Sequence, residues 1–392
     1  MIAIDTTIIS MEEINENRIF KSVSIFMAEL LDGFARLHYE NEICLIVVPQ
    51  TEKFVRERFP GYSVFVLDHI LLRLAYQISR KKKFGVAVLK RLGIYQKLVE
   101  DQRFEVIYFP YALPVYLSEL TIPSVITVHD LMIYHNEKKD NAIQKAFSGM
   151  IKGASQIVTI SDFTRQDVAK EFGVEVNDMA VIPNSIYVDV REQEYIPGLE
   201  RGYILDINGY GHHKNTLTLV QAFHQIKDSI SEDLVLCGAW KHDNYFEEIR
   251  DYVQGNGLEN RVHMLYQVSE KQRNYLLSHA CLFVTPSANE GFGRTPVEAA
   301  ICKVPVISTK AASLYEATMG MVYYYEDPWN VSALSERMLQ CLRVPMDMEE
   351  RTRIADLFTE TYSPERCAQQ YWDVFQKVIA TSSMDGQTPF VL

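Results

Sequence analysis

The sequence predicts an α/β protein of two domains, each with a parallel β-sheet covered by helices on both faces. Its 392 residues are enough for about two domains. Short apolar runs alternate with amphipathic helical segments through both halves of the chain, which is typical of parallel sheets. Two runs also end in glycine-containing loops that lead directly into helices, at 208–215 and 287–294. Doubly wound sheets bind their ligands at junctions of this kind.

The composition narrows the class of protein. The net charge of -12 disfavours nucleic acid as a partner, and 47% hydrophobic residues are enough for two cores. The six cysteines show no Cys-x-x-Cys spacing, so we expect free core thiols in a reducing compartment. The first residues lack the basic and apolar regions of a signal peptide, and no apolar run reaches membrane-spanning length. These features predict a cytoplasmic protein.

The first half contains six strand-like runs with helical patterns between most of them. One such helix is expected at Ser24–Leu37, where Ile25, Leu30 and Phe34 share an apolar face. The expected strands are Ile2–Ile9, Ile43–Val48, Val64–Leu67, Val106–Phe109, Val125–Val128 and Ile157–Ile160.

Polar residues follow two of these strands, where parallel sheets bind ligands. His129 and Asp130 end one strand, and Ser161 and Asp162 end another. For the first pair, two interpretations are open: ligand contact, or an aspartate that caps the following turn. For Ser161, we favour an N-cap before the helix 163–172.

The segment Arg73–Lys97 is basic and contains no acidic residue, although the whole protein is acidic. Apolar residues are interleaved with its eight arginines and lysines. A basic amphipathic helix can bind anionic lipid, so one interpretation is peripheral contact with a membrane or with a lipid-linked acceptor. The other is a solvated helix face.

Residues 187–202 lack apolar periodicity and contain Pro197 and Gly198, which indicates a linker. We therefore expect an N-terminal domain at 1–190, a C-terminal domain at 191–365 and a final helix at 366–380. The strands expected in the second half are Tyr203–Ile207, Leu234–Gly238, Val262–Leu265, Cys281–Val284 and Val304–Ser308.

The first of these strands runs into a loop that contains Gly209, His213 and Lys214. Backbone amides, the dipole of the following helix and the lysine together suit a diphosphate. Glycines alone are a weak signal, because tight turns use them freely. Arg261 either assists this diphosphate or lies on the surface.

The stretch 286–299 is the most specific part of the chain. Gly291 and Gly293 would allow the backbone to approach a ligand, and Glu290 supplies a carboxylate beside them. If Thr295 were an N-cap, Glu298 would complete a capping box; contact with a ligand is the alternative role for Glu298.

These motifs resemble those of the family 4 retaining glycosyltransferases, which have the GT-B fold of two Rossmann-like domains facing a central cleft. The sequence Pro-Ser-Ala-Asn-Glu-Gly-Phe-Gly from Pro286, followed by Glu298-Ala299, matches the family's Glu-x7-Glu motif. Lys214-Asn215 matches the family's diphosphate site. The chain departs from the family pattern in its glycine-free first loop, at Tyr210 and at Tyr266.

The resemblance implies transfer of a hexose from a nucleotide-diphosphate sugar to a glycan or lipid-linked hydroxyl, with retained anomeric configuration, in cell-surface polysaccharide synthesis. It implies catalytic roles for Glu290 and His129. No Asp-x-Asp follows an expected strand, so we predict a metal-independent reaction without a cofactor. The donor-binding residues that it implies are Lys214, Glu298, Gly209, His213, Gly291, Phe292 and Gly293.

Two other functions are compatible with this fold. A nucleotide-sugar 2-epimerase would act on the free donor with acid–base carboxylates, and a noncatalytic nucleotide- or glycan-binding module would tolerate loss of charge. The intact Glu290, Glu298 and Lys214 disfavour the noncatalytic module. An NAD-dependent oxidoreductase is disfavoured because no Gly-x-Gly-x-x-Gly follows a strand.

Overall fold

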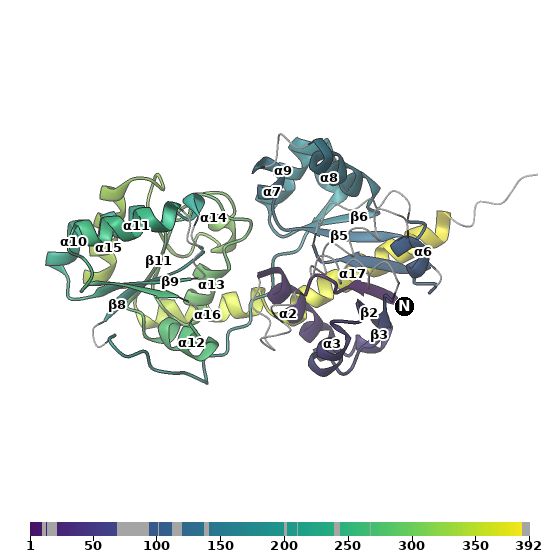
Figure 1. Cartoon of the computed structure of the whole chain (residues 1–392), viewed down its shortest axis with the longest axis horizontal. Coiled ribbons are helices and arrows are strands. Elements are labelled where there is room, and N and C mark those ends of the chain that lie inside the picture. The colour runs from purple at the N-terminus through teal and green to yellow at the C-terminus, as the bar shows by residue number, and fades with distance from the viewer. Residues whose placement is uncertain are drawn as a thin grey trace, which may run out of the picture. The chain divides into compact units, whose positions relative to one another are not determined.

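The computed structural model describes residues 1–9, 13, 22–68, 94–100, 102–111, 120–136, 141–199, 202–209, 211–238, 244–266 and 268–385. The chain divides into two compact units, coloured in chain order in Figure 1. The first comprises Met1–Ser185 together with Ser363–Leu392, and the second comprises Ile186–Tyr362.

The first unit contains a seven-stranded parallel sheet in the order β3-β2-β1-β4-β5-β6-β7. The order reverses direction between β1 and β4, which makes this position the switch point of a doubly wound sheet. The strands are β1 (Ile2–Asp5), β2 (Ile43–Val47), β3 (Ser63–Val66), β4 (Val106–Phe109), β5 (Ser124–Val128), β6 (Gln156–Thr159) and β7 (Met179–Val181).

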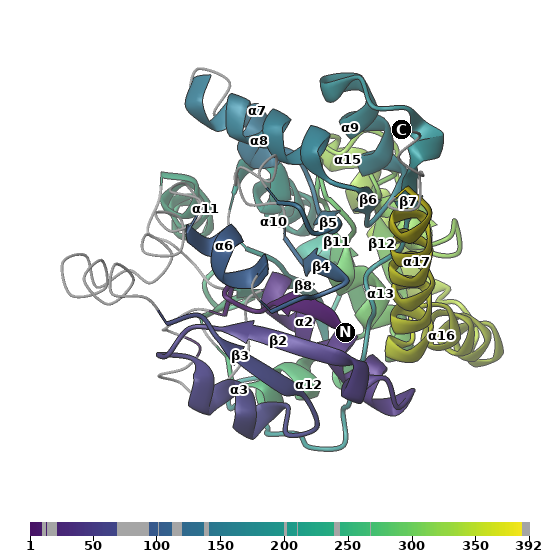
Figure 2. The ribbon, with the colours of Figure 1, turned by 90° about the vertical axis from the view of Figure 1, so that its right-hand side faces the viewer.

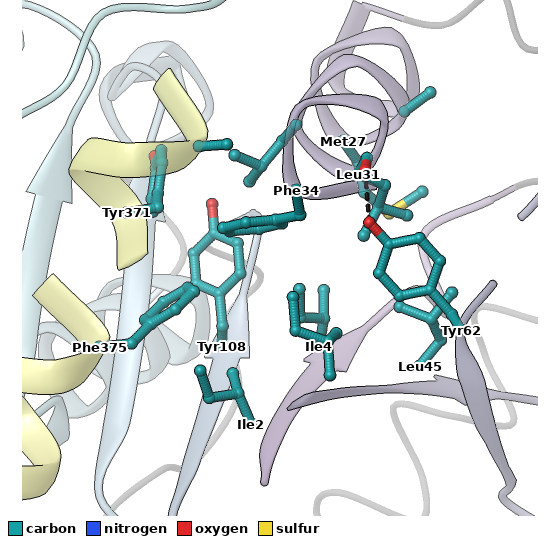
Figure 3. Close-up of a cluster of buried hydrophobic side chains, with 14 of the residues drawn as sticks. Ile2, Ile4, Met27, Leu31, Phe34, Leu45, Tyr62, Tyr108, Tyr371 and Phe375 are labelled. Carbon is teal, nitrogen blue, oxygen red and sulfur yellow. Dashed lines mark hydrogen bonds between the residues drawn. The ribbon is translucent and has the colours of Figure 1, made fainter. Parts of the chain in front are cut away.

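Helices cover both faces of this sheet. Alternate residues of β1 enter opposite cores, because side chains alternate along a strand: Ile2 and Ile4 enter one core and Ala3 the other. Figure 3 shows Ile2 and Ile4 in the first of these cores, with Phe34, Tyr108 and Tyr371. Within the described residues, the helices of the first unit are α2 (Ser22–Arg36), α3 (Glu52–Arg58), α6 (Ile94–Glu100), α7 (Met132–Asn136), α8 (Asn141–Gly153), α9 (Asp162–Phe172) and α17 (Pro364–Asp385).

The C-terminal helix α17 belongs to the first unit, although it follows the second unit in the chain. It packs along α2, where Gly33 leaves room for the backbone of Pro364; a Cβ on Gly33 would lie 2.2 Å from that carbonyl oxygen. Tyr39 of the first unit stacks on Trp372 with ring centroids 4.1 Å apart. Figure 2 shows α17 from a second side.

The second unit contains a six-stranded parallel sheet in the order β10-β9-β8-β11-β12-β13. Its switch point lies between β8 and β11. The strands are β8 (Tyr203–Ile207), β9 (Asp233–Gly238), β10 (Val262–Tyr266), β11 (Leu282–Thr285), β12 (Val306–Ser308) and β13 (Tyr323–Tyr324).

Two groups of helices pack among themselves around this sheet, α10 with α11 and α15, and α13 with α12 and α16 (Figure 1). An apolar core joins the first group to β8, β9 and β11. The helices are α10 (Thr216–Ile226), α11 (Asn244–Gly255), α12 (Glu270–His279), α13 (Arg294–Ile301), α14 (Leu314–Ala317), α15 (Val331–Arg343) and α16 (Met348–Thr361).

The expected strands are present with boundaries shifted by a few residues, and β7 and β13 are additional short strands. The run expected at Ile2–Ile9 stops pairing at Asp5, whose carboxylate accepts a hydrogen bond from the Thr7 backbone. All six cysteines are free thiols. Of the basic segment Arg73–Lys97, only residues 94–97 are described, so the interpretations of that segment lie outside the described residues.

Candidate functional site

The switch point of the second sheet brings two loops together. One loop follows β8 and leads to α10, and the other follows β11 and leads to α13. Since β8 and β11 are adjacent and parallel, both loops leave the same edge of the sheet. The Ala288 amide donates a hydrogen bond to the His213 carbonyl at 2.8 Å, which joins the loops directly.

Asn215 shapes the end of the first loop. It adopts a left-handed conformation with φ of 58°, which asparagine tolerates better than most residues. Its side-chain amide donates to the Pro286 carbonyl at 3.2 Å and to the Pro328 carbonyl at 2.6 Å. This buried side chain therefore fixes the position of the preceding residue, Lys214. In the sequence, only the match of Lys214-Asn215 to the family motif pointed to Asn215.

Lys214 and Glu290 meet across the two loops. The Lys214 Nζ donates to Glu290 Oε1 at 2.6 Å, and both side chains remain partly accessible, at 19% and 15%. The Ser313 hydroxyl donates a hydrogen bond to the Glu290 backbone carbonyl at 2.8 Å, which fixes the backbone of that loop. The pair thus places a cation and a carboxylate side by side at the edge of the sheet, where an anionic ligand with hydroxyl groups could engage both.

The glycine loop before α13 is shaped by tight packing. Gly293 has φ of 97°, and a Cβ there would lie 2.6 Å from Leu314 Cδ2. It occupies the N-cap of α13, where no side chain caps the helix. Phe292 is buried and packs edge-on against Tyr362, with ring centroids 5.4 Å apart. In contrast, a Cβ on Gly209 would meet no atom within 4 Å.

The capping box expected at Glu298 is wrong. Helix α13 begins at Arg294 after Gly293, so Glu298 lies more than one turn inside the helix. Its carboxylate instead forms an ion pair with Arg273 of α12 and lies 3.6 Å from Arg294. Burial opposes ionisation, but the two arginines lower the pKa of Glu298 below its ordinary value. The carboxylate is therefore ionised at neutral pH. Arg294 lies four residues before Glu298 on the same helix, whereas no motif in the sequence links Glu298 to Arg273 of α12.

A second buried carboxyl near these loops was also missed. Asp206, in β8, is 2% exposed and lies close enough to Lys214 and Glu290 for both charges to influence it. The strand around it is otherwise apolar, so an aspartate at this position was the feature of the sequence that could have indicated a buried carboxyl.

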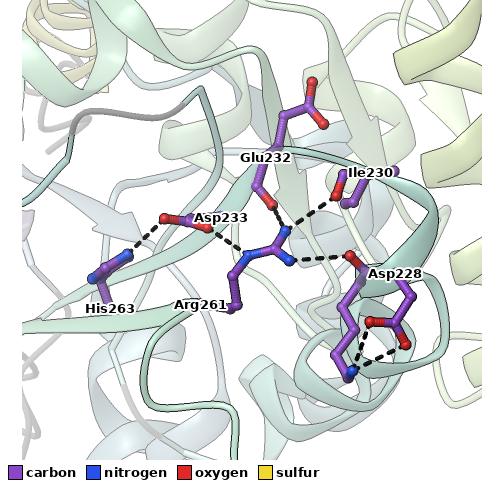
Figure 4. Close-up of polar contacts among 7 residues, drawn as sticks. Asp228, Ile230, Glu232, Asp233, Arg261 and His263 are labelled. Atoms are coloured by element: carbon purple, nitrogen blue, oxygen red, sulfur yellow. Dashed lines mark hydrogen bonds and ion pairs between the residues drawn. The ribbon is translucent and has the colours of Figure 1, made fainter.

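Arg261 has a different role from the proposed diphosphate contact. It precedes β10 and pairs with Asp233 at the start of β9, at 2.7 Å, so it lies at the amino-terminal edge of the sheet. Figure 4 shows its guanidinium surrounded by acceptors, including the carbonyls of Ile230 and Glu232. Ligand loops leave the opposite edge. Arg261 is therefore a structural residue, and His263 completes the cluster at 3.0 Å from Asp233.

In the first unit, His129 is buried at the end of β5. Its Nε2 lies 2.9 Å from the Pro110 carbonyl after β4, so it carries the proton that this acceptor needs. Its ring packs against Phe26. Asp130 accepts a hydrogen bond from the Met132 backbone at the start of α7, as the capping interpretation expects. The N-cap predicted at Ser161 is confirmed by its bond from the Thr164 amide.

One group among the described residues could hold a metal ion. His135, Asp167 and Glu171 of the first unit place their ligand atoms within 4.8 Å of one another. His135 Nε2 lies 2.9 Å from Asp167 Oδ2, so an ion pair accounts for part of this arrangement.

Comparison with protein families gives two adjacent matches. Residues 23–190 match the model described as Glycosyltransferase Family 4, and residues 192–356 match the one described as Glycosyl transferases group 1. Together these models span most of the chain.

The curated relatives include O-antigen chain mannosyltransferase B of Escherichia coli, which is 28% identical over 65% of this chain and 70% of that protein. O-antigen chain mannosyltransferase RfbU of Salmonella typhimurium is 28% identical over 53% of this chain and 59% of that protein. Among solved structures, Anabaena HepE in complex with UDP and glucose has a TM-score of 0.70 and 16% sequence identity to this chain. The match covers 96% of this chain and 99% of the HepE chain. These likenesses confirm the predicted two-domain α/β fold.

Proposed function

This chain is a glycosyltransferase of family 4 with the GT-B fold, and we propose that it transfers a hexose from a nucleotide-diphosphate sugar to a glycan hydroxyl. Mannose is the first candidate sugar, because the two bacterial relatives described above are O-antigen chain mannosyltransferases. We further propose that the product belongs to a cell-surface polysaccharide.

The pairing of Lys214 with Glu290 at the switch point is the observation that carries this proposal. When the bond between the anomeric carbon and the diphosphate breaks, negative charge develops on the leaving phosphate and positive charge on the sugar ring. A lysine and helix N-terminal amides stabilise the phosphate, and a carboxylate can hold sugar hydroxyls. We propose that the donor phosphate replaces Glu290 as the partner of the Lys214 ammonium. Glu290 then accepts hydrogen bonds from the sugar hydroxyls.

The other residues that we propose as donor contacts lie at the same edge of the sheet. We propose that Glu298, ionised between its two arginines, accepts hydrogen bonds from the ribose hydroxyls. The backbone of Gly291–Gly293 suits the phosphate by its position before α13. The Phe292 side chain supports this loop from the core, while Gly209 and His213 lie in the opposite loop.

For the first domain, we keep His129 as a proposed participant in the transfer step. The bond to the Pro110 carbonyl requires a proton on Nε2 of its imidazole, and this bond orients the ring. We also propose that the reaction retains the anomeric configuration and needs neither metal nor cofactor, with Lys214 and the helix amides supplying the positive charge.

A lipid-linked acceptor and peripheral membrane contact through Arg73–Lys97 are part of the proposal. Among the helices that the structure describes, none has both the length and the apolarity needed to cross a bilayer. Neutralising Arg80 to Lys83 should reduce sedimentation with vesicles that contain anionic lipid at low salt. Equal sedimentation of the variant and the native protein would remove this part of the proposal.

The test of the main proposal is calorimetric titration with GDP-mannose, UDP-glucose and ADP-glucose in the presence of EDTA, followed by product analysis. We expect one nucleotide series to bind and the Glu290→Gln variant to bind it but to lose transfer. The Arg191→Ala variant, which alters an exposed ion pair in the same domain, is the matched control. Failure of every donor to bind would overturn the proposal. Conversion of the donor to its 2-epimer without transfer would replace it with an epimerase.

A further inference from the structure

Asp206 is a buried acidic residue in the middle of an apolar strand. It lies in β8 between Leu205 and Ile207, pairs in register with Leu236 of β9, and is 2% exposed. An ionised carboxylate in such a position is costly unless charges or hydrogen bonds compensate it. The strand could bury an apolar side chain here without that cost, so the contacts of Asp206 indicate what the residue contributes.

Its two oxygens hold both ends of the loop between β8 and α10. Asn208 Nδ2 donates to Oδ1 at 2.5 Å, at the start of the loop. Thr216 Oγ1 donates to Oδ2 at 3.4 Å, where α10 begins. Lys214 and Asn215 lie between these two contacts. One side chain therefore joins the ends of the loop that carries the proposed diphosphate contact.

The charges around Asp206 only weakly offset the cost of burying its ionised carboxylate. Lys214 favours the ionised form, but its ammonium is paired with Glu290, and Glu290 itself disfavours ionisation of Asp206. Among the described residues, three further titratable groups feel the charge of Asp206, and all are neutral at pH 7: Cys237 of β9, Tyr245 of α11 and Tyr325 after β13. Burial is the largest influence and raises the pKa of Asp206 to about 7, while the bond from Asn208 and the charge of Lys214 oppose that rise.

We propose that Asp206 is a positioning residue that clamps the β8–α10 loop and takes up a proton when the donor diphosphate binds to Lys214. This inference rests on the proposed function, because it takes the diphosphate of a nucleotide sugar as the ligand. A diphosphate beside Lys214 brings negative charge close to Asp206. The ionised form of Asp206 then becomes less favourable, and the carboxyl binds a proton from solvent.

The linkage predicts how affinity varies with pH. Below the pKa of the free protein, Asp206 is already protonated and donor binding requires no proton. Above it, each binding event takes up a proton, so the dissociation constant rises with pH. We expect binding to be about tenfold weaker at about pH 8 than at about pH 6.

The experiment is calorimetry of the full chain with GDP-mannose and UDP-glucose at these two pH values, in buffers of different ionisation enthalpy. Intact nucleotide sugars are used because each of their phosphates has one ester bond and shares the anhydride bond, so neither has a second proton that titrates in this range. The native protein should show proton uptake at the higher pH. The Asp206→Asn variant, which keeps an acceptor and the shape, should bind without proton uptake and without the tenfold change.

Two further variants separate clamping from charge. Asp206→Ala removes the clamp, so it should bind more weakly than Asp206→Asn at both pH values. Asp233→Asn alters a buried aspartate at the opposite edge of the same sheet and should keep the proton uptake of the native protein. Equal binding by Asp206→Ala and Asp206→Asn would overturn the positioning role, and an unchanged pH dependence in Asp206→Asn would overturn the linkage.

A measurement without ligand distinguishes failure of this inference from failure of the proposed function. The folded-state pKa of Asp206 is raised, so the folded protein holds this proton where the unfolded chain has lost it, and stability falls as pH rises from about 4 to about 7. Asp206→Asn should therefore gain thermal stability relative to the native protein at about pH 8 and less at about pH 5. If this gain appears but GDP-mannose, UDP-glucose and ADP-glucose all fail to bind, the donor proposal is wrong. If the donors bind but the gain is missing, Asp206 does not hold the proton.

Discussion

The two edges of the second sheet each contain a buried aspartate, and the two aspartates are surrounded very differently. Asp233 at the amino-terminal edge is paired with Arg261 at 2.7 Å and with His263 at 3.0 Å (Figure 4). Asp206, towards the carboxyl-terminal edge, accepts bonds from the neutral side chains of Asn208 and Thr216.

The difference reflects what each edge does. At the amino-terminal edge, the Arg261 guanidinium also donates to carbonyls of the segment before β9, so charge and hydrogen bonds are satisfied within the protein. At the carboxyl-terminal edge, Lys214 and Glu290 are partly exposed and pair only with each other across two loops, as far as the described contacts show. A satisfied cluster stabilises the fold, whereas a partly exposed pair can exchange its partner for a ligand.

The largest effect is expected at the carboxyl-terminal edge. Lys214→Ala should lower kcat/KM for transfer roughly 100- to 1,000-fold, because the cation that stabilises the leaving diphosphate is lost. Steady-state kinetics with the donor found by calorimetry measures this. Lys214→Arg keeps the charge and should retain more activity than the alanine variant. Full activity in Lys214→Ala would place the diphosphate elsewhere.

The amino-terminal edge should respond in stability instead. Arg261→Leu leaves Asp233 buried without its main partner, so we expect a loss of about 3 kcal/mol in the free energy of unfolding of the second domain. Thermal and urea unfolding measure this loss, and donor affinity of the folded protein should not change. Arg191→Ala, at an exposed ion pair of the same domain, should show no measurable loss. Weakened donor binding in Arg261→Leu would erase the distinction between the edges.

A backbone change at the carboxyl-terminal edge should have an intermediate effect. Gly293→Ala must place a Cβ against Leu314 at positive φ, which we expect to cost about 2 kcal/mol and to disturb the loop before α13. Gly255→Ala is the control, because a Cβ there meets no atom within 4 Å. Unfolding midpoints and donor affinity should both fall in the first variant. If both variants behaved alike, the tight packing of this loop would have no functional consequence.

The smallest effect is expected for Glu298→Gln, which keeps the shape and removes the charge. Donor affinity should fall about tenfold, since a hydrogen bond to a charged acceptor becomes a neutral one. The lowered pKa of Glu298 implies stabilisation that is present above the ordinary carboxyl range and is lost as pH falls through the folded-state pKa. The stability difference between native and variant protein should therefore shrink below about pH 4. A constant difference would show that the arginines do not stabilise the ionised form.

The residues predicted for the candidate site lie in two continuous segments of the sequence, and the structure brings these two segments together. The strand–loop–helix patterns around Lys214 and Glu290 are visible as apolar runs followed by glycines. Of the two roles left open for Glu298, the capping box is wrong and contact with a ligand stays a prediction. Its local spacing suggested a capping box, but the helix begins at Arg294 and the partner Arg273 comes from another helix. Local patterns cannot identify partners that are distant in the chain.

By itself, the sequence determined the alternation of strands and helices, the position of the two loops and the types of residue that they carry, because periodicity and turn chemistry are local properties. Only the tertiary structure decided which charges meet. Parallel pairing of β8 with β11 puts Lys214 beside Glu290, although 76 residues separate them in the chain. The same pairing leaves Arg261 at the opposite edge and Asp206 between two loop ends. The electrostatic environment of each group depends on these distances and on burial, and both arise only when the sheet has formed.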